Sequence, residues 1–203
     1  MKEIMILDES HKRAFVHLIS AAFEKDPLFV HLLGPEAPAG RREKLAGFLW
    51  DKAHLMAEQR LGVAQDGKLL AACLLATPES RVTPSFPMIW RSLRLLRHFS
   101  PALLQQLNAY AEQTQKHAPD VAHHYLVLIG THPEHQGQGL GKQLMTHIMQ
   151  KVKQHRTSAG LALDTENADN VRLYQHLGFD LRHEAHLKDL PLYCMFRPRE
   201  ETT

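Results

Sequence analysis

The glycine-rich segment Gln136-Gly137-Gln138-Gly139-Leu140-Gly141 has the residue types and spacing of a phosphate site. Glycine has no β-carbon, so an anionic ligand can approach the main chain closely where glycines alternate. A segment with helical periodicity follows directly, and the amides at a helix N-terminus are unpaired and carry partial positive charge. The sequence therefore predicts that the main chain of 136–141 binds a phosphate group.

Two common nucleotide-binding motifs do not fit this spacing. A P-loop ends in Gly-Lys-Ser/Thr, whereas Gln143 follows Lys142 in this chain. The dinucleotide fingerprint Gly-x-Gly-x-x-Gly also fails, because its third glycine would have to come one residue after Gly141. The loop therefore belongs to another class of phosphate-binding site.

The 15 histidines do not show the spacing of a metal centre. His132 and His135 are three residues apart, but they lie in the glycine-rich loop, and His183 and His186 have no third ligand nearby. The sequence therefore predicts no metal site.

Composition indicates an ordinary soluble domain of the whole chain, 1–203. The net charge of +2, from 24 basic and 22 acidic residues, favours neither a nucleic-acid nor a membrane partner. The cysteines, Cys73 and Cys194, lie in apolar runs and are expected to be buried thiols. No apolar run reaches the roughly 20 residues that span a bilayer, and no signal pattern is seen, so we expect a cytoplasmic protein.

The elements around the loop follow from apolar patterning. Tyr125–Gly130 is a near-continuous apolar run, which indicates a strand covered on both faces. A helix is expected from the loop to about Lys153, followed by a strand at Leu161–Asp164, so the strand pair is parallel. A short helix at about Asp169–Leu177 ends at Gly178. The remaining predicted elements are an edge strand at Ile4–Leu7, a helix at Ala14–Glu24 ended by Asp26-Pro27, a helix near Arg41–Gln59, a hairpin turning at Asp66-Gly67, helices at Met88–Phe99 and Pro101–His117, and antiparallel strands at Leu181–Leu187 and Leu192–Phe196.

The spacing Gln-x-x-Gly-x-Gly, after Pro133 and a buried strand, resembles the pyrophosphate loop of the GNAT superfamily of acetyl-CoA-dependent N-acetyltransferases, and within it the puromycin N-acetyltransferase-like group. A second block agrees in order and distance: Thr165, Asn170, Tyr174 and Leu177-Gly178-Phe179. The resemblance implies an α/β fold with a mixed, mostly antiparallel central sheet, a splayed parallel strand pair and flanking helices. The CoA-binding core would be about 121–200, with a helical insert at about 81–117.

The resemblance also implies roles for individual residues. The loop amides would bind the CoA pyrophosphate, the strand before the loop would pair with the pantetheine arm, and an amide near Ile129 or Gly130 would polarise the thioester. Asn170 would bind pantetheine unless it only caps a helix, and Tyr174 would be the general acid unless it only packs. The implied cofactor-binding residues are Leu128, Ile129, Gly130, Thr131, Gln136, Gly137, Gln138, Gly139, Leu140, Gly141, Lys142, Asn170 and Tyr174.

The general base stays open at this point. Asp164 and His124 are both candidates, and each could equally be a polar residue at a strand end. The expected activity is direct acetyl transfer to an amine of a small molecule or peptide, by a monomer or homodimer. The acceptor would enter beside residues 23–33, the insert and residues 188–192. An inactive acyl-CoA-binding module and an unrelated nucleotide-binding domain are the alternatives.

Overall fold

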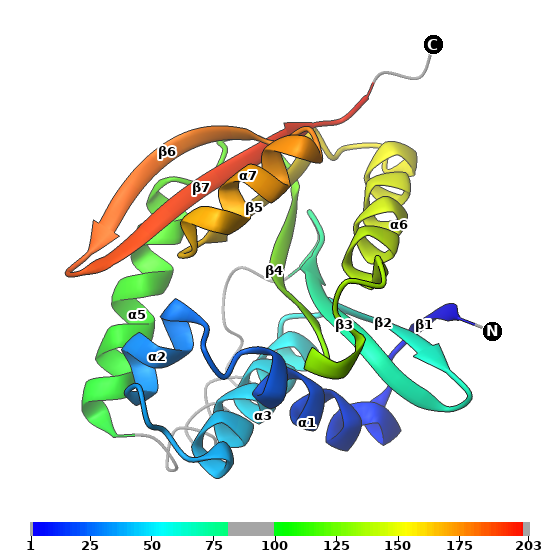
Figure 1. The fold of residues 1–203 in the computed structure, drawn as a ribbon. Helices are drawn as coiled ribbons and strands as arrows, with labels where there is room; N and C mark the ends of the chain where they lie inside the picture. The colour runs from blue at the N-terminus through cyan, green and yellow to red at the C-terminus, as the bar shows by residue number, and fades with distance from the viewer. Residues whose placement is uncertain (1, 81–99, 201–203) are drawn as a thin grey trace.

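A seven-stranded mixed sheet forms the centre of the fold in the computed structural model, which describes residues 2–80 and 100–200 (Figure 1). The strand order is β1-β2-β3-β4-β5-β7-β6, and only β4 and β5 pair in parallel. The strands are β1 (Glu3–Ile6), β2 (Gln59–Gln65), β3 (Lys68–Ala76), β4 (His124–Thr131), β5 (Gly160–Thr165), β6 (Asp180–Leu187) and β7 (Leu190–Pro198). The predicted mixed sheet with one parallel pair is confirmed.

Helices cover both faces of the sheet, which explains the continuous apolar strands. Along β3, Cys73 and Leu75 pack in the core cluster with α6, whereas Leu74 packs in the cluster with α1 and α3. The α-helices are α1 (Lys12–Ala22), α2 (Pro27–Leu33), α3 (Ala39–Leu55), α5 (Pro101–Lys116), α6 (Leu140–Gln154) and α7 (Ala168–His176). Tyr174 of α7 belongs to the α6 cluster, and Leu103 of α5 belongs to the α1 and α3 cluster.

The pair Asp26-Pro27 ends one helix and begins another. The sequence analysis predicted only the break, but the Asp26 carboxylate accepts hydrogen bonds from the amides of Leu28 and Phe29 at 3.0 and 3.1 Å. Proline at the first helical position needs no amide partner, so the two residues form a helix start. Helix α2 (Pro27–Leu33) was therefore missed although its signal was present.

One further helix boundary differs from the prediction, whereas the predicted hairpin is present. The helix expected to reach Gln59 ends at Leu55, because Gln59 is the first residue of β2 and pairs with Leu75. The hairpin is confirmed, with positive φ at both turn residues, Asp66 at 51° and Gly67 at 77°.

Of the predicted helical insert, only the second helix can be described. Ser100 caps α5 by accepting a hydrogen bond from the Leu103 amide at 3.3 Å. The predicted helix at Met88–Phe99 lies outside the described residues.

Within residues 2–80 and 100–200, no helix has both the length and the apolar character to cross a membrane. Cys73 and Cys194 are both free and buried, as predicted.

Gly130 allows α1 to pack closely against β4. A β-carbon at this position would lie 2.9 Å from the Phe23 ring and 3.0 Å from the Ile19 side chain. We therefore expect Gly130→Ala to lower the free energy of unfolding by about 1–3 kcal/mol, measured by urea denaturation. Gly40→Ala is the control, because no atom lies within 4 Å of its β-carbon position and alanine favours the helix. Equal stability of Gly130→Ala and the parent would contradict the packing argument.

Candidate active site

Strands β4 and β5 separate part-way along their length. Their pairing runs from His124 with Leu161 to Leu126 with Leu163 and then stops, although β4 continues to Thr131. The last residues of β4 still pair with β3 on their other side: Leu128, Ile129, Gly130 and Thr131 face Leu74, Cys73, Ala72 and Ala71. The backbone edge of β4 that faces β5 is therefore open to a ligand that pairs as an added strand would.

The glycine-rich loop presents unpaired amides at the start of α6. Gly139 is the N-cap of α6 with φ of 75°, and Gly137 has φ of 74°, so both use the left-handed conformation that glycine tolerates. No atom lies within 4 Å of a β-carbon position at either glycine. The first amide with a helical partner is that of Gln143, which donates to the Gly139 carbonyl at 2.9 Å. Among described residues, no partner takes the amides of 137–142.

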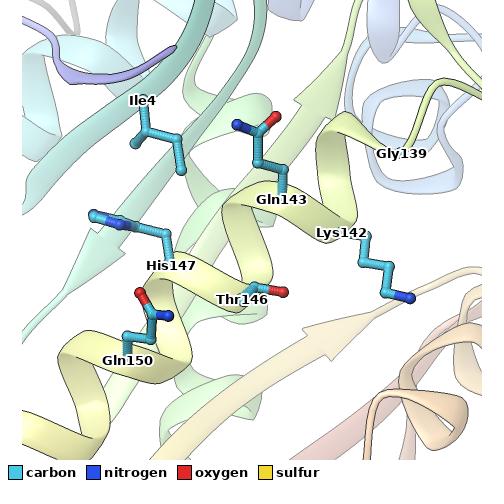
Figure 2. A pocket seen from close by; sticks show the side chains of 7 residues that line it. All are labelled: Ile4, Gly139, Lys142, Gln143, Thr146, His147 and Gln150. Atoms are coloured by element: carbon cyan, nitrogen blue, oxygen red, sulfur yellow. The ribbon is translucent and has the colours of Figure 1, made fainter. Parts of the chain in front are cut away.

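The long side chains around the loop leave this amide cluster accessible. In Figure 2, Gln143 and His147 extend from α6 on the side of Ile4 in β1, whereas Lys142 points away from them. Gln138 accepts a hydrogen bond from Lys2 at 2.9 Å, and the Gln136 side chain donates to the Thr131 carbonyl at 3.4 Å. Of the predicted phosphate-contacting residues, Gln136 thus contacts the end of β4, Gln138 contacts the residue before β1, and Lys142 points away from Gln143 and His147.

The hydroxyl of Tyr174, a residue of α7, makes no hydrogen bond to any described residue. The side chain is 8% exposed and its ring packs edge-on against Phe179, with centroids 5.7 Å apart. Burial, with the charges of Glu166 and Asp164, raises the pKa of Tyr174 to about 12. The hydroxyl is therefore protonated at neutral pH and free to donate.

Two carboxyl groups share one tyrosine hydroxyl next to the opening. The Asp164 carboxylate accepts hydrogen bonds from the hydroxyls of Tyr125 in β4 and Tyr110 in α5, and Tyr110 also contacts the Glu166 carboxyl group. A tyrosine hydroxyl has a single proton, so it donates to one carboxyl group and accepts from the other. One of Asp164 and Glu166 must therefore carry a proton in this arrangement.

The pKa shifts indicate which group holds that proton. Burial raises the pKa of Asp164 to about 6, and burial together with the charge of Asp164 raises the pKa of Glu166 to about 8. The pKa of Glu166 is raised by burial and by the Asp164 charge together, so Glu166 is the group that holds the shared proton more readily, while the Asp164 carboxylate accepts hydrogen bonds from Tyr125 and Tyr110. Asp164 and Glu166 thus form one hydrogen-bonded group around the Tyr110 hydroxyl next to the opening.

Residues 26–179 match the acetyltransferase (GNAT) family, a span of more than half of the 203 residues. The span contains the glycine-rich loop, the parting strands, Asp164 and Tyr174. The chain belongs to the GNAT acetyltransferase family.

Several solved structures share this fold along nearly their whole length. One is a Corynebacterium glutamicum protein described as "histone acetyltransferase HPA2 and related acetyltransferase", which is 18% identical in sequence. The match covers 100% of this chain and 98% of that protein, with a TM-score of 0.72. Arylalkylamine N-acetyltransferase 2 from Aedes aegypti is 15% identical in sequence. The match covers 98% of this chain and 99% of the Aedes chain, with a TM-score of 0.67. The Salmonella typhimurium protein yncA, solved with its cofactor acetyl-CoA, is 16% identical in sequence. The match covers 100% of this chain and 96% of yncA, with a TM-score of 0.55. At these identities the likeness shows the fold alone.

His124 and Asp164, the two candidate bases, are not brought together. His124 is 1% exposed at the paired end of β4, and its Nδ1 atom lies 2.8 Å from the Ser158 hydroxyl. Burial lowers its pKa to about 4. Tyr125, the next residue of β4, contacts Asp164. Because neighbouring residues of a strand point to opposite faces of the sheet, the His124 side chain lies on the face away from Asp164.

Asn170 does not cap α7. The cap is Asn167, whose side chain accepts a hydrogen bond from the Asp169 amide at 2.9 Å, so the alternative that Asn170 is only a helix cap is wrong. Asn170 lies one turn further on and donates to the Thr165 hydroxyl at 3.3 Å. Its side chain thus lies at the end of β5, near the opening where the resemblance places the pantetheine arm.

Three acidic or tyrosine side chains of the site were not selected from the sequence: Tyr110, Glu166 and Asp26. Tyr110 reaches Glu166 across 56 positions of the chain, a separation at which sequence periodicity carries no signal. Burial raises the pKa of Asp26, and its charge in turn raises the pKa of Glu166. Asp26, which directly precedes α2, thus acts electrostatically on Glu166 next to Asp164.

Proposed function

We propose that the chain transfers the acetyl group of acetyl-CoA directly to a primary amine of a small molecule or peptide. The observation that carries this proposal is the set of unpaired amides at 137–142 next to the open edge of β4, because a pyrophosphate and its extended arm need both. Residues 125–179 support a place in the puromycin N-acetyltransferase-like group, acting as one domain over 1–203.

Tyr174, the proposed acid, and Asp164, the proposed base, lie at the opening on opposite faces of the sheet. Tyr174 packs in the cluster with α6, whereas Tyr110, which contacts Asp164, extends from α5, whose Leu103 packs in the cluster with α1 and α3. We infer that CoA lies on the Tyr174 side and that the amine enters on the α5 side. A small pocket of about 20 Å³ next to Asp164 has room for one water molecule.

The proposed reaction uses Asp164 to accept one proton and Tyr174 to donate another. The amine nitrogen attacks the thioester carbon and forms the carbon–nitrogen bond, while its surplus proton passes to the Asp164 carboxylate, directly or through a water. The carbon–sulfur bond then breaks, and the departing sulfur takes the proton of Tyr174. Backbone amides near Ile129 and Gly130 are proposed to stabilise the charge that develops on the carbonyl oxygen. No covalent enzyme intermediate is needed.

We expect Gly139→Asp to weaken coenzyme A binding at least about tenfold, or about 1.4 kcal/mol. The new carboxylate would lie against the pyrophosphate at the N-terminus of α6. Calorimetry with coenzyme A measures the effect. Gly67→Asp is the matched control, because Gly67 has a similar φ of 77° in the hairpin turn and also has no atom within 4 Å of its β-carbon position. Equal affinity of the two variants would exclude the loop as the pyrophosphate site.

Turnover is tested by release of free thiol from acetyl-CoA in the presence of a panel of amines that includes puromycin. Thiol release that depends on one amine would support the proposal. Tight coenzyme A binding without thiol release for any amine would instead indicate an acyl-CoA-binding module without catalysis.

A further inference from the structure

Three metal-ligand side chains gather in the turn between β4 and the glycine-rich loop. His132, Glu134 and His135 each offer one ligand atom, and these atoms all lie within 4.8 Å of one another. The Nδ1 atom of His132 is 3.7 Å from a carboxylate oxygen of Glu134. The turn is a 3-10 helix, Pro133–His135, in which the His135 amide donates to the His132 carbonyl at 2.8 Å. The backbone thus holds both imidazoles on one side of a short turn.

The two imidazoles each have a buried nitrogen that lacks a partner. Within the described residues, neither Nδ1 of His132 nor Nε2 of His135 makes a hydrogen bond, although both atoms are shielded from solvent. An unsatisfied buried polar atom costs about 1–3 kcal/mol. The nearest cation to Glu134 is Lys68, whose Nζ atom is 3.8 Å from the carboxylate, a long contact between two exposed side chains. A bound cation would supply a partner for all three donors.

We propose that His132, Glu134 and His135 bind a zinc ion, with water as the fourth ligand. Two imidazoles and one carboxylate are a common protein ligand set for zinc, which bonds to them at about 2.0–2.2 Å and so brings tetrahedral ligands to about 3.4 Å from one another. The three donors need only a modest closure to reach that spacing. The Glu134 side chain is exposed on the surface and its carboxylate already lies 3.7 Å from the His132 imidazole.

The ion would lie between the strand and the loop of the proposed acetyl-CoA site. Thr131, the last residue of β4, precedes His132, and Gln136 follows His135. Zinc would therefore fix the turn through which the chain passes from β4 to the unpaired amides. Because the folded turn holds the three ligand atoms close together, we expect zinc to stabilise the native state. This inference does not depend on acetyl transfer, so its test reads metal binding and stability.

The test titrates metal-free protein with zinc chloride by calorimetry and, separately, with cobalt(II), whose visible absorption reports low-coordinate protein ligation. The parent is expected to bind one zinc ion tightly and to show a higher melting temperature in its presence. His135→Gln and Glu134→Gln are each expected to lower the zinc affinity at least about tenfold and to remove the cobalt absorption. Glu134→Gln changes only an exposed side chain, so a loss there does not come from misfolding.

The control variant is His186→Gln, which removes an exposed histidine of β6 outside the turn. It is expected to bind zinc as the parent does. The proposal would be overturned if the parent bound no zinc, or if both turn variants bound it as tightly as His186→Gln, since other histidines of the chain would then hold the ion.

Discussion

Tyr174→Phe is expected to lower turnover by about 10²–10⁴-fold, the usual contribution of a positioned general acid, with little change in acetyl-CoA affinity. The substitution removes one hydroxyl and keeps the ring, which packs against Phe179. Because no described residue occupies that hydroxyl, its loss leaves no orphaned partner in the protein. Steady-state kinetics with the best amine, together with calorimetry for acetyl-CoA, separate the effect on turnover from the effect on binding.

The matched control for Tyr174→Phe comes from the same helix. Leu173 is 55% exposed, so Leu173→Ala truncates a neighbouring side chain that points to solvent. We expect this variant to keep near-normal turnover. If Tyr174→Phe also turned over normally, Tyr174 would be a packing residue and the departing thiolate would take its proton from elsewhere. If both variants lost activity together with thermal stability, the loss would reflect the folding of α7.

The conformation of the glycine-rich loop and its flanking elements could be predicted because their signals are local. The glycines of 137–141 act through their own backbone conformation, and the apolar stripes of β4 and α6 repeat within a few residues. The same local reasoning found the αL residue Gly178 at the end of α7, where φ is 83°. The conformation of these segments depends mainly on residues adjacent in the chain, so the sequence alone indicates it.

The contacts around Asp164 could not be predicted in the same way. The contact of Tyr110 with Asp164 joins residues 54 positions apart, and the Asp164 pKa depends on burial that only the packed chain creates. From the sequence, His132 and His135 were set aside because they lie in the glycine-rich loop, and only the folded turn shows that Glu134 comes near both imidazoles. Asp26 was recognised as a helix breaker, but its burial among the acidic groups is a property of the tertiary structure.

Asp164→Asn is expected to lower turnover by about 10²–10⁴-fold, because an amide cannot accept the proton that the attacking nitrogen loses. In the parent, burial raises the pKa of Asp164 to about 6, so activity should fall as the pH drops below about 6 and the carboxylate becomes protonated. That acidic limb of the pH–rate profile should disappear in Asp164→Asn. A limb with the same midpoint in the variant would mean that another group is the base.

Tyr110→Phe separates the role of Asp164 as a base from a purely structural role. The hydrogen bond from Tyr110 lowers the pKa of Asp164 against the larger effect of burial. Without it, the carboxylate is harder to ionise, so the acidic limb should move to a pH above about 6 while turnover recovers at higher pH. A merely structural tyrosine would lower turnover at every pH without moving the midpoint. The direction of the shift thus links Tyr110, a residue of α5, to the proton that leaves the amine.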